Sequence, residues 1–386
     1  MPWKECSVVD ERLRFIVAAK DGDENFSELC RQFGISRKTG YKWLDRYDEH
    51  GPCGLQARAP IAHQHPHRTP DAVVDVILKA RKEHPFWGPK KLRAFIAERH
   101  PEFEMPAAST IGELLKQHGL IRPRRRRPRA PLPGSPIQPS DRPNALWCAD
   151  FKGHFALGDR SRCHPLTLTD RYSRYLLKCE ALPEPTTKLS RVQFEHAFRE
   201  FGLPDRIRTD NGPPFASVGI GGLSELSVWW IKLGILPERI EPGRPEQNGQ
   251  HERMHRTLKE EATKPPCATL LDQQRVFDRF RHEYNDVRPH EALEQKPPAR
   301  LYVRSARVYP QLLRELEYGE DFIVRKTDDK GRLRRKGKNV VLTKLLANEL
   351  LGLRPLDDDR WELFFGPVLL GVLDETRDEP RLVRAA

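Results

Sequence analysis

The sequence predicts a multidomain protein in which two all-α N-terminal units precede a central α/β domain and a small strand-rich C-terminal domain. Apolar residues at helical spacing dominate residues 1–121. Short strand-like segments that alternate with helices fill residues 142–303, and strand and hairpin signals return after residue 317. An Arg- and Pro-rich stretch over residues 122–141 predicts a linker between the helical and α/β parts.

Residues 1–60 are predicted to form a helix-turn-helix unit. A first helix over Glu11–Lys20 is followed by a short helix capped by Ser27, and Gly34 separates this from a third helix capped by Ser36. The third helix presents side chains that suit phosphates and base edges, namely Arg37, Lys38, Tyr41 and Lys42. DNA binding is therefore expected, and a plain three-helix bundle with a basic surface is the alternative.

Residues 68–121 predict a second helical unit of the helix-turn-helix kind. Its expected helices run from Asp71 to about His84, over Lys90–Arg99 and over Ala107–His118. In the linker that follows, four consecutive arginines could lie along a DNA backbone and release its counterions. They are Arg124, Arg125, Arg126 and Arg127, and a solvated spacer is the alternative.

The central domain, residues 142–303, is predicted to hold a mixed set of strands and helices. The expected strands are Leu146–Phe151, His164–Thr169, Tyr175–Cys179 and Arg206–Thr209, and the expected helices are Lys188–Phe201, Asn248–Thr263 and Leu270–Asp286. In the C-terminal domain, residues 317–386, Gly366-Pro367 lies between two apolar segments and predicts a hairpin. We expect a small β-barrel there.

Composition favours a nucleic-acid partner inside a reducing compartment. The 386 residues carry a formal net charge of +12, which suits a polyanion, although an ordinary basic enzyme has the same property. The scattered cysteines predict no disulfide framework and fit a reducing cytoplasm, and we expect neither a membrane span nor a signal peptide. His63, His65 and His67 lie near Cys53 but lack the paired spacing of structural zinc sites.

Two aspartates stand at the ends of expected strands. Asp150 lies in the apolar segment Trp147–Phe151, and Asp210 opens an Asp-Asn-Gly turn after Thr209. Each has an ordinary structural explanation, as a solvent-facing strand end or as a turn former. Neither residue alone predicts a catalytic site.

Glu252 changes the interpretation because it lies near the start of an expected helix downstream of both aspartates. Arg256 and Lys259 share its face at i+4 and i+7, so an acid that holds metal would lie beside bases that hold phosphate. Three carboxylates from different elements can bind a pair of divalent ions for phosphodiester chemistry. A surface Glu–Arg pair is the structural alternative.

In this order, the segments Trp147–Lys152, Thr209–Phe215 and Asn248–Lys259 resemble the signature of DDE recombinases related to retroviral integrases. They are more similar still to bacterial insertion-sequence transposases, as are Tyr284–Leu293 and the Pro297-Pro298-Ala299 that follows. The resemblance covers residues 142–303. It implies an RNase H-like core, Mg²⁺ or Mn²⁺ as a pair of bound ions, and double-stranded DNA as substrate. It also implies hydrolysis at transposon ends, joining of the 3′-hydroxyl to target DNA, and a homo-oligomer assembled on DNA.

The resemblance assigns Asp150, Asp210 and Glu252 as catalytic metal ligands. Family members often have 35 residues between the second Asp and the Glu, a spacing that Glu246 satisfies and Glu252 exceeds by six. We choose Glu252 because it follows the Asn-Gly pair as the family's Glu does, and a Gly-rich insertion accounts for the extra length. Asp170 is interpreted as structural. A catalytically silent regulator and a nuclease that cuts without joining remain alternative functions.

Overall fold

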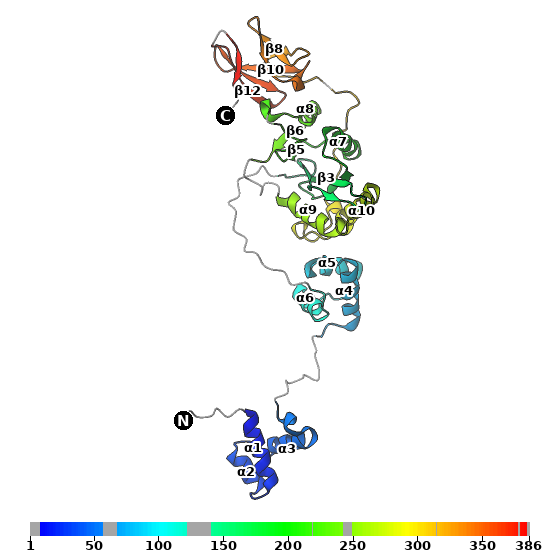
Figure 1. Ribbon diagram of the computed structural model, residues 1–386, viewed down its shortest axis with the longest axis vertical. Coiled ribbons are helices and arrows are strands. Elements are labelled where there is room, and N and C mark those ends of the chain that lie inside the picture. The colour runs from blue at the N-terminus through cyan, green and yellow to red at the C-terminus, as the bar shows by residue number, and fades with distance from the viewer. Residues whose placement is uncertain are drawn as a thin grey trace. The chain divides into compact units, whose positions relative to one another are not determined.

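The computed structural model describes residues 8–56, 68–121, 140–217, 219–241, 249–313, 315–376 and 379–383. The chain divides into two compact units, Met1–Arg68 and Thr69–Ala386 (Figure 1). Some residues singled out in the sequence lie outside the described residues: His63, His65, His67, Arg124, Arg125, Arg126, Arg127 and Glu246. Within the described ranges, no helix combines the length and the apolarity that crossing a membrane requires.

The first unit contains the expected helices α1 (Val8–Asp21), α2 (Phe26–Gln32) and α3 (Arg37–His50). Ser36 caps α3 as predicted, since its side chain accepts from the backbone N–H of Thr39. The expectation that Ser27 caps α2 is wrong. Asn25 takes that role, because its side-chain oxygen accepts from the N–H of Ser27, two residues further into the helix.

The second unit begins with three helices, α4 (Asp71–Glu83), α5 (Pro89–Arg99) and α6 (Ala108–Gln117), close to the ranges expected. Trp87, between α4 and α5, is buried in their common core. Val287, from the end of the central domain, packs against the same core, and Lys90 of α5 forms an ion pair with Glu291 at 2.6 Å. The helical segment is therefore in contact with the segment that follows the last long helix of the central domain.

A mixed six-stranded sheet forms the central domain. Its strands are β1 (Trp147–Phe151), β2 (Phe155–Ala156), β3 (Arg162–Asp170), β4 (Leu176–Leu182), β5 (Arg206–Thr209) and β6 (Leu236–Arg239). β3 pairs antiparallel with β1, β2 and β4, whereas β1, β5 and β6 are mutually parallel. The sequence did not predict β6, which is short, contains a proline and is largely exposed or half-buried.

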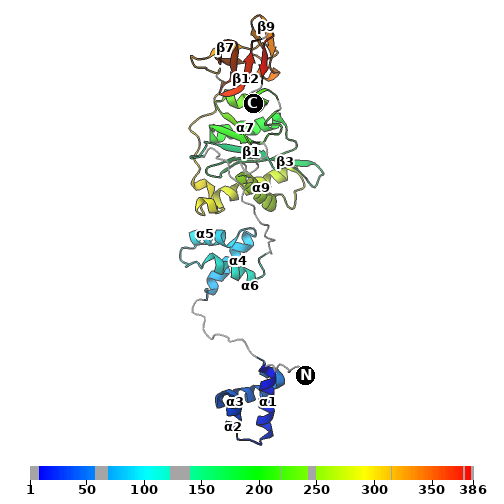
Figure 2. The same ribbon diagram turned by 90° about the vertical axis from the view of Figure 1, so that its left-hand side faces the viewer.

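Helices cover both faces of this sheet. Figure 1 shows α7 (Thr187–Phe201) and α8 (Glu225–Lys232) on one face and α9 (Gly249–Ala262) and α10 (Leu270–His282) on the other, and Figure 2 shows α7 and α9 on opposite faces. Because strand side chains alternate, Trp147 and Ala149 of β1 enter the α7–α8 core. The arrangement agrees with the RNase H-like core that the resemblance implies.

The C-terminal residues form an open sheet rather than the small β-barrel predicted from the sequence. The strands are β7 (Ile323–Lys326), β8 (Arg332–Arg335), β9 (Lys338–Val341), β10 (Leu350–Pro355), β11 (Arg360–Phe365), β12 (Val368–Asp374) and β13 (Arg381–Val383). Among the described residues, β7 and β13 are the two edges of a five-stranded sheet and do not pair with each other. The β8–β9 hairpin is a separate ladder whose buried residues belong to the same apolar core as the five-stranded sheet. The hairpin covers that core, so the sheet does not need to close into a barrel to bury its apolar face.

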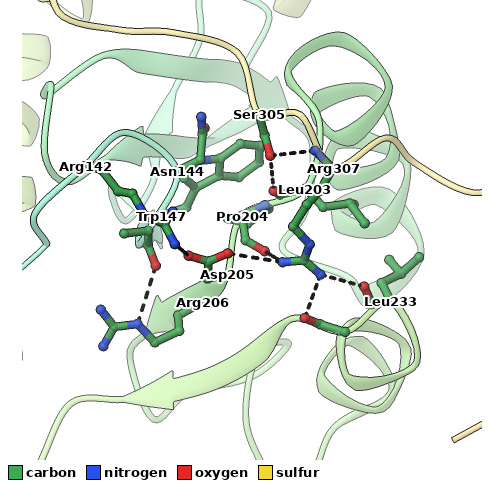
Figure 3. A network of polar contacts seen from close by, with 12 residues as sticks. Arg142, Asn144, Trp147, Leu203, Pro204, Asp205, Arg206, Leu233, Ser305 and Arg307 are labelled. Carbon is green, nitrogen blue, oxygen red and sulfur yellow. Dashed lines mark hydrogen bonds and ion pairs between the residues drawn. The ribbon is translucent and has the colours of Figure 1, made fainter.

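Arg307 ties the segment after the central domain to the loop before β5 and to the turn after α8. Its guanidinium donates to the backbone carbonyls of Pro204 (2.6 Å) and Leu233 (3.1 Å), as Figure 3 shows, and to that of Gly234 (2.7 Å). Ser305 donates to the carbonyl of Leu203 at 2.7 Å in the same network. These bonds hold the chain where it enters β5.

A glycine makes this close approach possible. Gly202 has φ of +78°, and a Cβ at this position would lie 2.6 Å from the carbonyl oxygen of Ser305. Gly153 has a similar φ of +77° with nothing within 4 Å of its Cβ position. We expect Gly153→Ala to cost about 1 kcal/mol of unfolding free energy from backbone strain alone, and Gly202→Ala about 3 kcal/mol because the Ser305 segment must also move. Urea unfolding of both variants tests this, and equal losses would contradict it.

Candidate active site

The pairing of β1 with β5 positions the two aspartates. The parallel register aligns Trp147 with Ile207 and Cys148 with Arg208. Two steps further, the same register brings Asp150 level with Asp210, the first residue after β5. The end of β1 and the end of β5 therefore present both carboxylates at one edge of the sheet.

The turn after β5 is held in place by its own side chains. Asp210 Oδ1 accepts from the backbone N–H of Gly212 at 3.3 Å, and Asn211 Nδ2 donates to the carbonyl of Ile240 at 2.9 Å. Asn211 thus fastens the turn to the residue that follows β6. The Asp210 carboxylate remains exposed.

Glu252 lies in the first turn of α9 and is exposed. Arg256 and Lys259 are exposed on the same helix, at the i+4 and i+7 positions expected to share its face. The opposite face is buried against β3, β4 and α10 through an apolar cluster that includes Met254 and Leu258. Because this apolar face of α9 is buried, Glu252 on the opposite face points away from the core, toward the sheet edge that carries the two aspartates.

Electrostatics link the three carboxylates. The pKa of Asp150 is raised from 3.8 to about 7, chiefly because burial disfavours its charged form. The negative charge of Asp210 raises it further, and the charge of Glu252 adds a smaller increment. The structure thus brings the residues selected from the sequence into one interacting group of like charges.

Two buried histidines of α9, which the sequence analysis did not select, complete this group. His251 and His255 are 2% and 5% exposed, and their ligand atoms lie with one from Asp150 within 4.8 Å of one another. Nδ1 of His255 is 3.7 Å from Oδ2 of Asp150. The available signal was their i, i+4 spacing on the otherwise apolar face of the helix.

Thr167 of β3, the cross-strand partner of Asp150, determines how the histidines are arranged. Its hydroxyl donates to the Asp150 carbonyl (3.1 Å) and can accept Nε2–H from His251 (2.8 Å) and from His255 (2.7 Å). The hydroxyl of Thr169 lies 2.9 Å from Nδ1 of His251 and can donate to it. This assignment leaves Nδ1 of His255 as a free lone pair toward Asp150.

Both imidazoles are neutral at physiological pH. Burial lowers the pKa of His251 to about 3. It also lowers that of His255 to about 2, with further repulsion from His251 and Lys152. A neutral imidazole is the form that binds metal, and of the two only His255 has a nitrogen, Nδ1, that is free to do so. Carboxylate oxygens are preferred ligands of Mg²⁺ and Mn²⁺. The three carboxylates, with Nδ1 of His255 beside Asp150, fit a divalent cation.

Asp170 has the structural role expected of it. The side chain is fully buried and accepts from the N–H of Asn144 (2.7 Å) and from the N–H (2.8 Å) and hydroxyl (2.6 Å) of Ser173. Three donors satisfy the carboxylate within the turn that follows β3. It is therefore engaged away from the carboxylate group at the sheet edge.

The expected DNA-contacting residues of α3 differ in their surroundings. Arg37 donates to the hydroxyl of Ser27 at 3.4 Å, and Tyr41 is 55% exposed although its ring packs against Phe26 with centroids 4.4 Å apart. Lys42 lies over the ring of Trp43, with Nζ 5.3 Å from the centroid, and Lys38 is exposed. The helix presents these side chains on the surface of the first unit.

Comparisons with known families agree with this geometry. Residues 140–245 match the integrase core domain, and residues 233–298 match a second description of the integrase core domain. Residues 11–60 match a helix-turn-helix domain, and residues 39–115 match a homeodomain-like domain. The two integrase matches together contain β1, β5 and α9, which carry the three carboxylates.

The chain is also similar to insertion-element proteins and retroviral polyproteins. An uncharacterized 39.2 kDa protein of insertion element IS476 from Xanthomonas euvesicatoria is 29% identical over 67% of this chain and 75% of its own length. An uncharacterized 31.7 kDa protein of insertion element IS407 from Burkholderia multivorans is 28% identical over 49% of this chain and 66% of its own. The Gag-Pol polyprotein of baboon endogenous virus is 30% identical over 55% of this chain but only 12% of the polyprotein.

Removing the Thr167 hydroxyl should destabilise the chain. In Thr167→Val the Nε2–H groups of His251 and His255 lose their shared acceptor inside a buried interface, which should cost about 2 kcal/mol of unfolding free energy. Thr257→Val is the matched control, since its hydroxyl bonds only to the carbonyl of Arg253 on the exposed side of α9. Urea unfolding should show little change in the control; an equally stable Thr167→Val would contradict the assigned network.

Proposed function

We propose that this chain, a DDE polynucleotidyl transferase with an integrase core domain and helix-turn-helix domains, is a DNA transposase. It binds the ends of a mobile DNA segment, hydrolyses a phosphodiester bond there and joins the freed 3′-hydroxyl to target DNA. The observation that carries the proposal is the convergence of Asp150, Asp210 and Glu252 at one sheet edge, within the residues that match the integrase core.

In this proposal, Asp150, Asp210 and Glu252 hold two Mg²⁺ or Mn²⁺ ions. Bound between these carboxylates, the ions would supply activation of the attacking oxygen and stabilisation of the leaving oxygen. Asp150 is the most buried of the three, and burial and the charges of its neighbours raise its pKa to about 7, so cations that neutralise those charges favour its ionised form. Arg256 and Lys259 lie on the exposed face of α9 that carries Glu252, and they orient the DNA by contacting backbone phosphates.

The proposed reaction consists of two successive substitutions at phosphorus. In the first, a water oxygen bonds to phosphorus as the bond to the 3′ oxygen breaks, and the transposon end leaves with a 3′-hydroxyl. In the second, that hydroxyl oxygen bonds to a target phosphorus while a target 3′ oxygen leaves with the proton. No bond forms between protein and DNA, so no side chain serves as nucleophile.

The remaining parts of the chain position DNA around this centre. We assign recognition of transposon ends to residues 1–60 and 68–121, and a DNA-backbone contact to the arginines of residues 122–141. Residues 142–303 form the catalytic core, and residues 317–386 form the C-terminal sheet domain. Because two ends must be joined together, the active form is a homo-oligomer assembled on paired ends.

Neutral isosteres of the three carboxylates should separate catalysis from DNA binding. Asp150→Asn, Asp210→Asn and Glu252→Gln remove ligand charge without removing volume, and each should lower strand transfer by at least about a thousandfold. Affinity for terminal DNA in EDTA should change less than about threefold. A strand-transfer assay on terminal DNA with Mg²⁺, beside fluorescence anisotropy, measures both.

Glu246→Gln is the matched control for the third ligand and should retain joining activity. Activity in Glu252→Gln together with its loss in Glu246→Gln would move the ligand to the position that family spacing favours. The same assay distinguishes the alternatives. Cut but unjoined product identifies a nuclease, and binding without any product identifies a silent regulator.

The α3 residues should contribute to affinity without contributing to chemistry. Arg37→Ala and Lys38→Ala should each weaken binding of terminal DNA about tenfold and lower the slope of log Kd against log salt by about one. Lys20→Ala is the control, because Lys20 of α1 forms an ion pair with Asp48 at 2.7 Å. Unchanged affinity in the α3 variants, measured by anisotropy on the full chain, would exclude α3 from the interface.

A further inference from the structure

A cavity of about 150 Å³ lies on the side of α9 that faces α5. Its lining comes from α5, from α9, from the turn after β3 and from the segment that follows α10. A second, smaller cavity shares four of its lining residues and is also lined by His251. The larger cavity therefore lies close to the carboxylate group.

The cavity is lined by four cationic side chains, namely Lys91, Arg174, Arg253 and Arg288. Arg288 forms an ion pair with Glu261 at 2.5 Å, and the one carboxylate in the lining, Glu291, is held by Lys90. Among the described residues, no carboxylate lies within ion-pair distance of Lys91, Arg174 or Arg253. Three positive charges thus share one small cavity without an ion pair of their own, although Glu261 and Glu291 lie near enough to attract Lys91.

This arrangement is costly in the absence of an anion. Burial lowers the pKa of Lys91 to about 7, and the positive charge of Arg288 contributes to the shift. Burial also lowers the pKa of Arg174, and Arg253 repels it. Buried or half-buried charges that lack partners destabilise a fold unless a ligand supplies the opposite charge.

A buried polar atom of the same cavity also lacks a partner. His290 is 9% exposed, and its Nε2 has no hydrogen-bond partner among the described residues. Burial, Lys91 and Arg288 together hold the imidazole neutral. An anion placed between these cations would offset part of their positive field and so favour a proton on Nε2, which would then donate to the anion.

We propose that this cavity binds a backbone phosphate of the DNA strand that occupies the catalytic site, with Lys91, Arg174 and Arg253 as its cationic ligands. Arg253 follows Glu252 directly on α9, and consecutive helical residues point about 100° apart around the helix axis. The proposed phosphate site therefore lies beside the Glu252 carboxylate on the neighbouring side of the same helical turn. Lys91 belongs to the helical segment 69–121, so one phosphate joins that segment to the catalytic core. The assignment to DNA rests on the proposed function, whereas the anion site does not.

The anion site is tested with inorganic phosphate on the full chain in EDTA. Phosphate should raise the thermal unfolding temperature relative to chloride at equal ionic strength, because it binds the folded chain. Lys91→Gln and Arg253→Gln should lose most of that rise. Arg275→Gln, which removes an exposed arginine paired with Asp272 at 3.0 Å on α10, should keep it. A rise that is absent in the wild type, or intact in Arg253→Gln, would overturn the site.

The assignment to DNA is tested by anisotropy on labelled duplexes. Arg253→Gln should weaken binding about tenfold on terminal and unrelated sequences alike and lower the salt slope by about one, while Arg275→Gln should change neither. An unchanged salt slope in a variant that has lost the phosphate effect would overturn the DNA assignment. A wild type that binds phosphate through these residues but joins no DNA would refute the transposase function and leave the anion site standing.

Discussion

The parallel pairing of β1 with β5 is the constraint on which the site depends. Neighbouring parallel strands place equal register steps side by side, so Asp150 and Asp210 meet without any contact between their own side chains. The two-residue period of β1 sends Trp147 and Ala149 into the α7–α8 core and leaves Asp150 facing α9. A slip of one residue would place the aspartate in that apolar core.

Two kinds of contact attach α9 to the sheet, and they do different things. The apolar cluster around Met254 and Leu258 supplies burial but tolerates small shifts of the helix. The bonds from Thr167 to His251 and His255 specify one rotation of the helix, because another rotation would leave buried nitrogens unsatisfied. The polar contact thereby determines the direction in which Glu252 points.

The sequence predicted the parts of the site that depend on local pattern. Asp150 and Asp210 were candidates because each lies near the end of an apolar segment, and Glu252 because its helix has a charged face, but only the resemblance in the order of the three motifs selected them as one site. His251 and His255 were missed since their role depends on Thr167, more than 80 residues away in the chain. The phosphate cavity could not be predicted, because Lys91 and Arg288 come together only when α5 packs on the central domain.

The C-terminal domain shows the same limit. The hairpin at Gly366-Pro367 was predicted from local turn chemistry and is present as β11 and β12. The basic run that forms β8 gave no strand signal, because one inward residue, Leu333, is its only fully buried side chain. Sheet closure is decided by which edges pair, and alternation within single strands carries no information about that.

Glu252 and Arg253 of α9 carry opposite charges that the helix itself keeps apart. Consecutive helical residues point about 100° from each other, so Glu252 and Arg253 cannot neutralise one another although they are adjacent in sequence. In the described part of the chain, Asp210 and Glu252 on one side and the cavity cations Lys91, Arg174 and Arg253 on the other form no ion pair, whereas Arg288 is paired with Glu261. A free anion would satisfy one face and a free metal ion the other. A DNA strand that brings a divalent cation to one phosphate and presents the next to the cavity satisfies both, and in this way the arrangement favours a metal-bound polynucleotide over either ligand alone.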